Sequence, residues 1–104
     1  MIDARGLPAA PLDAAQAFSQ RHVGDARAAA PHDCVVIFDA ADHTHDGWRL
    51  AMVQELAREA VPGRVNAIVG NDKAAIAQVR DFLAGAPGVT GQVFTTNGNR
   101  EDNR

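Results

Sequence analysis

Carboxylates and imidazoles gather in one short polar segment of the sequence, which contains Asp39, Asp42, His43, His45 and Asp46. A histidine titrates near neutral pH, so either imidazole paired with a neighbouring carboxylate could transfer protons in catalysis. The candidates for such a catalytic role are Asp39, Asp42, His43 and His45. Two imidazoles one residue apart can also bind a metal ion together with carboxylates. The sequence has no third ligand at a recognised spacing, so we expect no metal site. The alternative is a hydrated loop in which Asp46 caps the following helix.

Two regular elements flank this polar segment and would hold it in place. Cys34–Phe38 is apolar without alternation, which is typical of a strand buried on both faces of a parallel sheet. Residues 47–61 show the clearest helical pattern, with Asp46 or Thr44 able to cap the start and Pro62 following the end. The polar segment is therefore predicted to connect the carboxyl end of a strand to the start of a helix.

The rest of the chain continues this alternation of helices and strands. Helices are predicted at residues 12–30, with Asp13 as N-cap, and at Lys73–Ala84, which repeats apolar residues at helical spacing. Val65–Val69 reads as a second buried strand, and residues 91–96 as a third, shorter strand.

The order α-β-α-β-α-β predicts a single α/β domain, a half-sized Rossmann-like unit of three layers with a small three-stranded parallel sheet. Residues 1–11 and 97–104 are expected to be irregular. Ligands of open α/β sheets bind beyond the carboxyl ends of the strands. The segments expected to meet there are residues 39–46, 70–72 and 95–99.

Composition narrows the class of protein. The chain has 104 residues, of which 46% are hydrophobic and 22% charged, a balance typical of a globular domain rather than of a disordered chain. The net charge of −3 and the lack of a basic run argue against a nucleic-acid or anionic-membrane partner. A single cysteine, no apolar run long enough to span a bilayer and no signal-peptide core predict a cytoplasmic location.

The helix predicted at residues 47–61 is apolar on two sides. One side carries small and aliphatic residues, and Trp48, Met52 and Leu56 fall on nearly the opposite side. A helix that packs on a sheet needs only one apolar face. The second face is covered either by the helix at residues 12–30 or by another subunit, in which case Trp48, Met52 and Leu56 are the predicted interface anchors.

Five isolated residues are interpreted as structural. His22 and His32 are expected at the surface or at helix ends, and Cys34 as an inert buried thiol. Asn66 is expected to form hydrogen bonds within its strand, and Gly91 to permit close packing.

Two stretches carry motifs of a known family. Residues 54–68 read Gln-Glu-Leu-Ala-Arg-Glu-Ala-Val-Pro-Gly-Arg-Val-Asn-Ala-Ile, and residues 82–93 read Phe-Leu-Ala-Gly-Ala-Pro-Gly-Val-Thr-Gly-Gln-Val. They resemble the E-L-A … R-V-N-A-I and F-L … T-G-Q passages of the short-chain dehydrogenases/reductases, which lead into that family's sixth and seventh strands. Residues 96–99 stand where the family has an Asp-Gly-Gly ending. The resemblance, over residues 34–99, implies the C-terminal half of that fold, around strands five to seven.

The sequence departs from the family where the family's chemistry resides. The resemblance would imply a glycine-rich turn that holds a dinucleotide, and a catalytic Tyr with a Lys four residues later. The chain has no tyrosine and no such turn. Phe38 and Asp42 stand at the matching positions, where a phenyl ring cannot donate a proton and a carboxylate cannot replace an ammonium. We therefore expect no cofactor and carry over no catalytic residue.

These observations favour a non-catalytic, short-chain-dehydrogenase-like module, a truncated pseudoenzyme that acts through association. Without the family's earlier strands, the strand at 34–38 would have an open edge, and open edges invite pairing. The predicted partner is a second copy of the chain or a full-length short-chain reductase, with the helices at 12–30 and 47–61 at the interface. The alternative is a small enzyme that uses residues 39–46 for acid/base chemistry on a carbonyl or acyl substrate. The family's usual substrates would place that enzyme in a fatty-acid or polyketide pathway.

Overall fold

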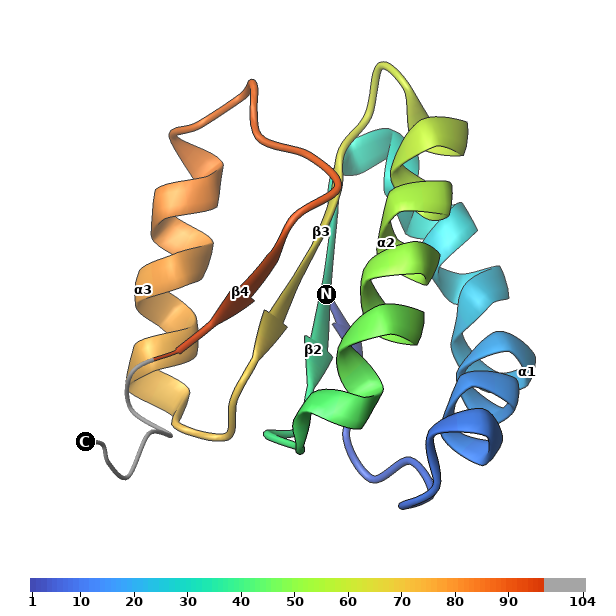
Figure 1. The fold of residues 1–104 in the computed structure, drawn as a ribbon. Helices are drawn as coiled ribbons and strands as arrows, with labels where there is room; N and C mark the ends of the chain where they lie inside the picture. The colour runs from blue at the N-terminus through green and yellow to red at the C-terminus, as the bar shows by residue number, and fades with distance from the viewer. Residues whose placement is uncertain (97–104) are drawn as a thin grey trace.

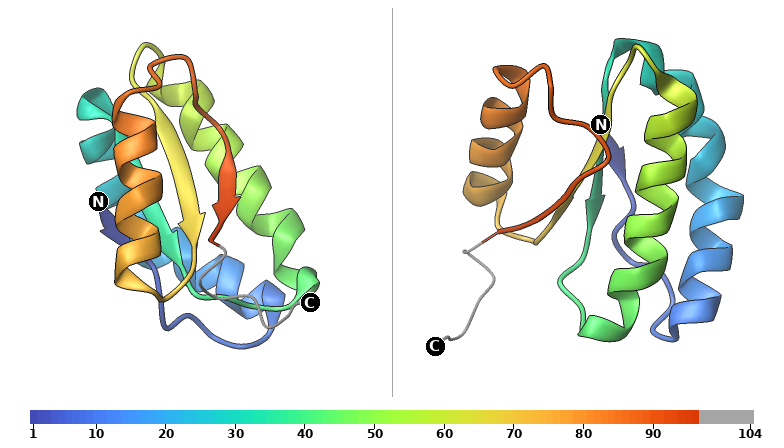
Figure 2. Two further views of the ribbon diagram at one scale, coloured as in Figure 1. Left: turned by 90° about the vertical axis from the view of Figure 1, so that its left-hand side faces the viewer. Right: turned by 45° about the horizontal axis from the view of Figure 1, so that its top comes forward.

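The computed structural model describes residues 1–96 and has three layers (Figure 1). A parallel sheet lies in the middle, α1 and α2 cover one face, and α3 covers the other (Figure 2). In chain order the elements are β1 (Ile2–Asp3), α1 (Pro11–Ala29), the 3-10 helix η1 (Ala30–His32), β2 (Cys34–Phe38), the 3-10 helix η2 (His43–His45), α2 (Asp46–Ala60), β3 (Val65–Val69), α3 (Lys73–Ala84) and β4 (Val93–Thr95). The predicted α/β, Rossmann-like half unit is confirmed. The predicted irregular tail at 97–104 lies outside the described residues.

Both apolar stretches form the buried parallel strands that the sequence predicts. β2 and β3 pair along their whole length, from Cys34 opposite Val65 to Phe38 opposite Val69. All five residues of β3 are buried, because helices pack on both faces of the sheet. The third predicted strand, β4, pairs with the second half of β3.

The sheet has four strands, in the order β1-β2-β3-β4, and not the three expected. Ile2 and Asp3 pair with Val36 and Ile37, and the N–H of Ala4 continues the ladder to the carbonyl of Ile37 at 2.8 Å. Residues 1–11 are therefore not wholly irregular. The expected open edge beside β2 is also wrong, since β1 occupies it. A strand of two residues is too short to show an alternating pattern, so β1 could not be predicted from the sequence.

Three aromatic rings form the centre of the core between the sheet and the α1/α2 layer. Trp48 lies with its ring centroid 5.7 Å from that of Phe18 on α1 and 5.5 Å from that of Phe38 on β2. Further along α2, Leu56 is buried and Met52 is half-buried against the same core. Of the two alternatives for the second apolar face of α2, the structure shows that α1 packs against it.

Two of the expected helix caps differ from the structure. The N-cap of α1 is Ala10, with no side-chain cap, and Asp13 lies in the first turn, because Pro11 already provides the backbone angle that starts the helix. α2 begins at Asp46 directly after η2, so neither Asp46 nor Thr44 caps it with a side chain. At the start of α3, the carboxylate of Asp72 accepts the N–H of Ala75 at 2.9 Å and caps the helix.

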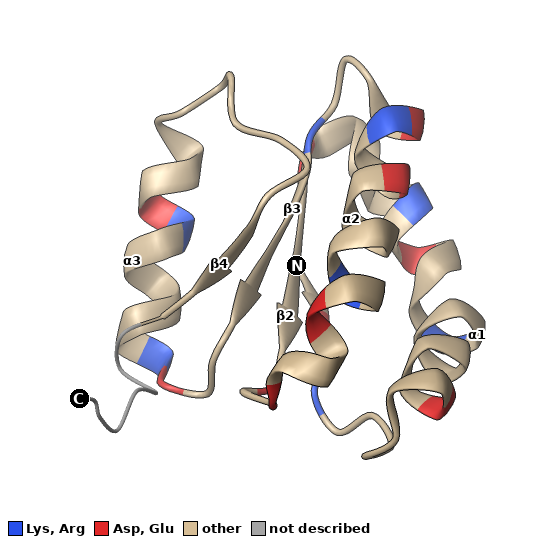
Figure 3. Ribbon diagram, viewed as in Figure 1, with Lys and Arg blue, Asp and Glu red and all other residues tan. Residues whose placement is uncertain are grey.

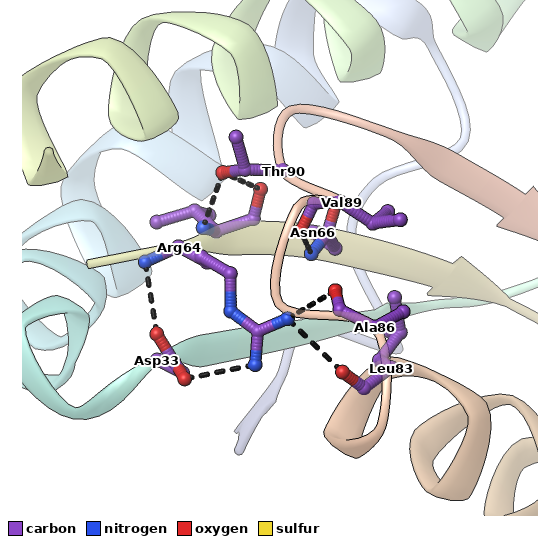
Figure 4. A network of polar contacts seen from close by, with 8 residues as sticks. Asp33, Arg64, Asn66, Leu83, Ala86, Val89 and Thr90 are labelled. Carbon is purple, nitrogen blue, oxygen red and sulfur yellow. Dashed lines mark hydrogen bonds and ion pairs between the residues drawn. The ribbon is translucent and has the colours of Figure 1, made fainter. Parts of the chain in front are cut away.

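A network of polar groups joins the amino edge of the sheet to the end of α3 (Figure 4). Arg64 forms an ion pair with Asp33 at 2.9 Å. The Nη1 atom of Arg64 also donates to the carbonyls of Leu83, at 3.0 Å, and Ala86, at 2.6 Å. The guanidinium thereby adds a charged donor to two carbonyls at and just after the end of α3, which also accept the N–H groups of Ala86 and Val89.

Asn66 and Gly91 hold the adjacent loop against β3. The Asn66 amide donates to the carbonyl of Val89 at 3.0 Å (Figure 4). It also accepts the N–H of Gln92 at 3.0 Å, which confirms its hydrogen-bonding role. Gly91 has φ of +73°, a conformation that side chains rarely adopt. A Cβ there would lie 3.6 Å from Ala57, an ordinary contact. Backbone conformation, and not the predicted close packing, explains this glycine.

Charged side chains of both signs are interspersed over the helices (Figure 3). The exposed ion pairs Arg27–Glu59 and Arg58–Glu55 illustrate this mixture on α1 and α2. Among residues 1–96, no helix is long and apolar enough to cross a membrane.

Candidate functional site

The segments that follow the strands meet at the carboxyl edge of the sheet, as predicted. The N–H of Gly70, after β3, donates to the carbonyl of Phe38, at the end of β2, at 2.9 Å. The N–H of Thr96, after β4, donates to the carbonyl of Val69 at 3.0 Å. Residues 97–99 of the third predicted segment lie outside the described residues. This edge is where ligands of open α/β sheets bind.

Asp39 is engaged in holding two loops. Its Oδ2 accepts the backbone N–H of Gly6 at 2.6 Å. The side-chain amide of Asn71, turned so that its nitrogen faces acceptors, donates to Asp39 Oδ1 at 3.1 Å. These contacts connect the loops after β1, β2 and β3, which is a positioning role and not a proton-transfer role.

Asp42 caps the short helix η2. It accepts the N–H of Thr44 at 3.0 Å and also the hydroxyl of Thr44. These two hydrogen bonds, the hydroxyl first, lower the pKa of Asp42 below its ordinary value. A carboxylate stabilised in its charged form in this way is a weak base.

His45 is buried and uses both ring nitrogens. The indole N–H of Trp48 can only donate, so His45 Nδ1 accepts it, at 3.0 Å. The other nitrogen, Nε2, must then carry the hydrogen and donate it to the carbonyl of Ala9, at 2.9 Å. The ring is held as a neutral tautomer between α2 and the loop before α1, so it has no nitrogen left for a substrate.

His43, the fourth candidate, is exposed, and its side chain forms no hydrogen bond with the other residues between 1 and 96. The structure therefore does not join the four candidates into a hydrogen-bonded acid/base pair. No group of three metal-ligating side chains lies together in the part of the chain that is described.

Arg49, in the first turns of α2, was not among the functional residues predicted from the sequence. It is only 6% exposed, and its guanidinium lies 4.6 Å from the ring centre of Phe38 and 5.8 Å from that of Trp48. Its Nη1 donates to the carbonyl of Asp39 at 2.9 Å. Burial lowers its pKa. A signal existed, because Arg49 precedes the buried Val53 by four residues and so falls on the buried face of α2.

Two cavities at this edge share Arg49. One, of about 500 Å³, lies between α2 and the ends of β3 and β4. It is lined by Ala40, Ala41, Asp46, Arg49, Leu50, Val69, Gln92, Val93 and Thr95. The other, of about 280 Å³, lies on the side of the loop before α1. The buried guanidinium thus separates two spaces beneath the loop that follows β2.

Cys34 is buried at the opposite edge of the sheet, at the start of β2. Burial raises the pKa of its thiol. The thiol therefore stays protonated near neutral pH, in agreement with the inert role expected of it.

Comparison with known proteins supplies the ancestry of this fold. The model of a family described as "short chain dehydrogenase-like protein" (SDR-like) matches residues 2–96, which includes β1 and α1 as well as the motifs of the second half. No curated protein and no solved structure matched. Since the family match spans nearly the whole chain, this chain belongs to the SDR-like family of short chain dehydrogenase-like proteins.

Proposed function

We propose that the chain is a non-catalytic short chain dehydrogenase-like module that acts through association. Its partner is a second copy of the chain or a full-length reductase of the same family. The outer surface of the α1/α2 layer forms the interface.

The state of the candidate catalytic groups supports a non-catalytic role. Asp39 and Asp42 accept hydrogen bonds from the backbone, and both nitrogens of His45 are bonded within the chain. The sequence also has no tyrosine. Of the four candidates, only His43 has an exposed side chain without a hydrogen bond to another described residue, and a lone imidazole is weak support for the alternative enzyme.

The observation that carries the proposal is an apolar cleft between the C-terminal ends of α1 and α2. Its volume is about 520 Å³, and its walls include Leu56, Ala60, Val61 and Pro62. Val61 is 70% exposed, so a branched aliphatic side chain stands uncovered at the rim. A cleft with an exposed apolar rim is typical of a surface that another protein covers.

An ion pair fixes the spacing of the two helices at this cleft. Arg27 on α1 holds the carboxylate of Glu59 on α2 with two donors, Nε and Nη2, each at 2.8 Å. This geometry sets the separation of the helix ends, so the cleft is present before a partner binds. A preformed cleft avoids part of the entropy lost on association.

The three predicted anchors differ in how close they lie to this cleft. Leu56 lines the cleft, and Met52 is half-buried on the same helix. Trp48 packs in the aromatic core, so a charge at Trp48 would damage folding as well as association. Val61 is the better position for a test.

Sedimentation velocity at micromolar concentration tests the proposal with Val61→Glu and, as a matched control, Leu12→Glu. Leu12 is 82% exposed and lies at the far end of α1, so its variant adds the same charge away from the cleft. We expect the wild type and Leu12→Glu to dimerise and Val61→Glu to weaken dimerisation at least about tenfold.

A wild-type chain that stays monomeric alone but sediments with a full-length short-chain reductase of its organism identifies the second partner, and Val61→Glu should weaken that complex too. A chain that associates with neither contradicts the proposal.

A further inference from the structure

We propose that the 500 Å³ cavity beside Arg49 binds a small monocarboxylic acid with an apolar body. This binding site is independent of the cleft between α1 and α2 and goes beyond the association proposed above.

The donors of Arg49 are the first reason. Nη1 is bonded to the carbonyl of Asp39, whereas Nε is buried without a hydrogen-bond partner and Nη2 has none among residues 1–96. No carboxylate lies within 4.0 Å of the guanidinium in the described chain. A buried donor that is left unbonded is costly, so structures rarely keep one without a purpose.

Other arginines of the same chain show what those two donors are suited to bind. Arg5 holds the carboxylate of Asp3 through Nε at 2.8 Å and Nη2 at 3.0 Å. Arg27 holds Glu59 through the same pair of atoms. The Nε and Nη2 edge of a guanidinium matches the two oxygens of a carboxylate. In Arg49 this edge is the part left without a protein partner.

The walls of the cavity define the rest of the ligand. Ala40, Ala41, Leu50, Val69 and Val93 supply an apolar surface. Gln92 and Thr95 add two polar side chains on the β4 side. A short hydrocarbon body would fit against the aliphatic residues while its carboxylate meets Arg49. A lining that is mostly apolar with a few polar groups is typical of small-molecule binding sites.

Nearby charges restrict the acid to a single negative charge. Asp46 lines the same cavity, and both Asp39 and Asp46 act on the charge of Arg49 at longer range. A dianion such as phosphate would meet these carboxylates, whereas a monocarboxylate adds one charge beside one guanidinium. We therefore expect the site to prefer a monocarboxylate to phosphate.

Access to Nε requires a small movement that can be detected. Since Nε is buried, the acid engages it only when the guanidinium turns toward the cavity. That turn changes the contact with Trp48, whose ring centre lies 5.8 Å from the guanidinium carbon. Trp48 is the only tryptophan of the chain, so the tryptophan fluorescence comes from a ring that lies beside this guanidinium.

The experiment is a titration of the 104-residue chain with sodium hexanoate, followed by Trp48 fluorescence, with sodium phosphate at equal ionic strength as the comparison. We expect a saturable change with hexanoate and at least about tenfold weaker binding of phosphate. No saturable change with hexanoate, or equal binding of phosphate, overturns the proposal.

Two variants keep the result interpretable. Arg49→Gln should weaken hexanoate binding about tenfold or more, because the charge-assisted pair is lost. Should that variant fold poorly, Asp46→Asn is informative, since Asp46 is exposed and makes no side-chain cap. It should tighten hexanoate binding several-fold by removing a repelling charge. Unchanged or weaker binding by a folded Asp46→Asn contradicts the assignment.

Discussion

Each of the two edges of the sheet holds an arginine, and the hydrogen bonds of the two guanidinium groups differ. At the amino edge, Arg64 is bonded to a carboxylate and to two carbonyls (Figure 4). At the carboxyl edge, Arg49 is more deeply buried but has one carbonyl partner and an orphaned Nε. A guanidinium bonded to a carboxylate and two carbonyls stabilises the fold, whereas a buried one with an unbonded Nε costs stability. The contrast indicates that the arginine of the amino edge serves stability, and it supports the binding role proposed above for the carboxyl edge.

The largest effect on stability is expected from Arg64→Met. The substitution removes the two charge-assisted hydrogen bonds that Arg64 Nη1 donates to the carbonyls of Leu83 and Ala86, which keep only their backbone donors, and it breaks the ion pair with Asp33. We expect the free energy of unfolding to fall by about 2–3 kcal/mol, measured by urea denaturation with far-UV circular dichroism.

The matched control is Arg58→Met. Its ion pair with Glu55 is well exposed, so its loss should leave the free energy of unfolding nearly unchanged. If both variants lost the same free energy of unfolding, the network around Arg64 would have no special role in stability.

A smaller, pH-dependent effect is expected from Asp33→Asn. The hydrogen bond from Arg64 lowers the pKa of Asp33 in the folded protein. A lowered pKa stabilises the fold at pH values above the ordinary pKa of an aspartate, and that contribution disappears as the pH falls through the folded-state value. Asp33 has φ of +66°, a conformation that asparagine also tolerates, so the substitution tests the charge.

For this half-exposed pair the wild type should be more stable than Asp33→Asn by up to about 1 kcal/mol at neutral pH, and the difference should vanish in strong acid. Urea titrations at several pH values measure it. A difference that persists at the lowest pH would show that the charge is not its cause.

The smallest effect on stability is expected from Arg49→Met. The substitution removes one hydrogen bond and the contact with the aromatic rings, but it also removes a buried charge that lacks an ion-pair partner within 4.0 Å. These effects offset each other, so the free energy of unfolding should stay within about 1 kcal/mol of the wild type. A loss as large as that of Arg64→Met would mean that Arg49 is a structural residue and not a binding residue.

The comparison of the two edges also separates what the sequence could predict from what it could not. β2, β3 and α3 have the predicted bounds, because a continuous apolar strand and a helical repeat are local patterns. β1 was missed because two residues carry no pattern. The sequence indicated that polar loops meet at the carboxyl edge, but not that Asp39 and His45 are bonded to residues 6 and 9. Such contacts depend on how distant loops pack, which spacing does not reveal.

Association remains the central claim of the functional account, and its most direct test is a dilution series of ¹H–¹⁵N spectra of the wild-type chain. Concentration-dependent shifts are predicted for amides lining the cleft between α1 and α2, at Leu56, Ala60 and Val61. The amide shifts of residues 39–46 should not change with concentration. Spectra that do not change with concentration, or changes confined to the carboxyl edge, would contradict self-association through this cleft.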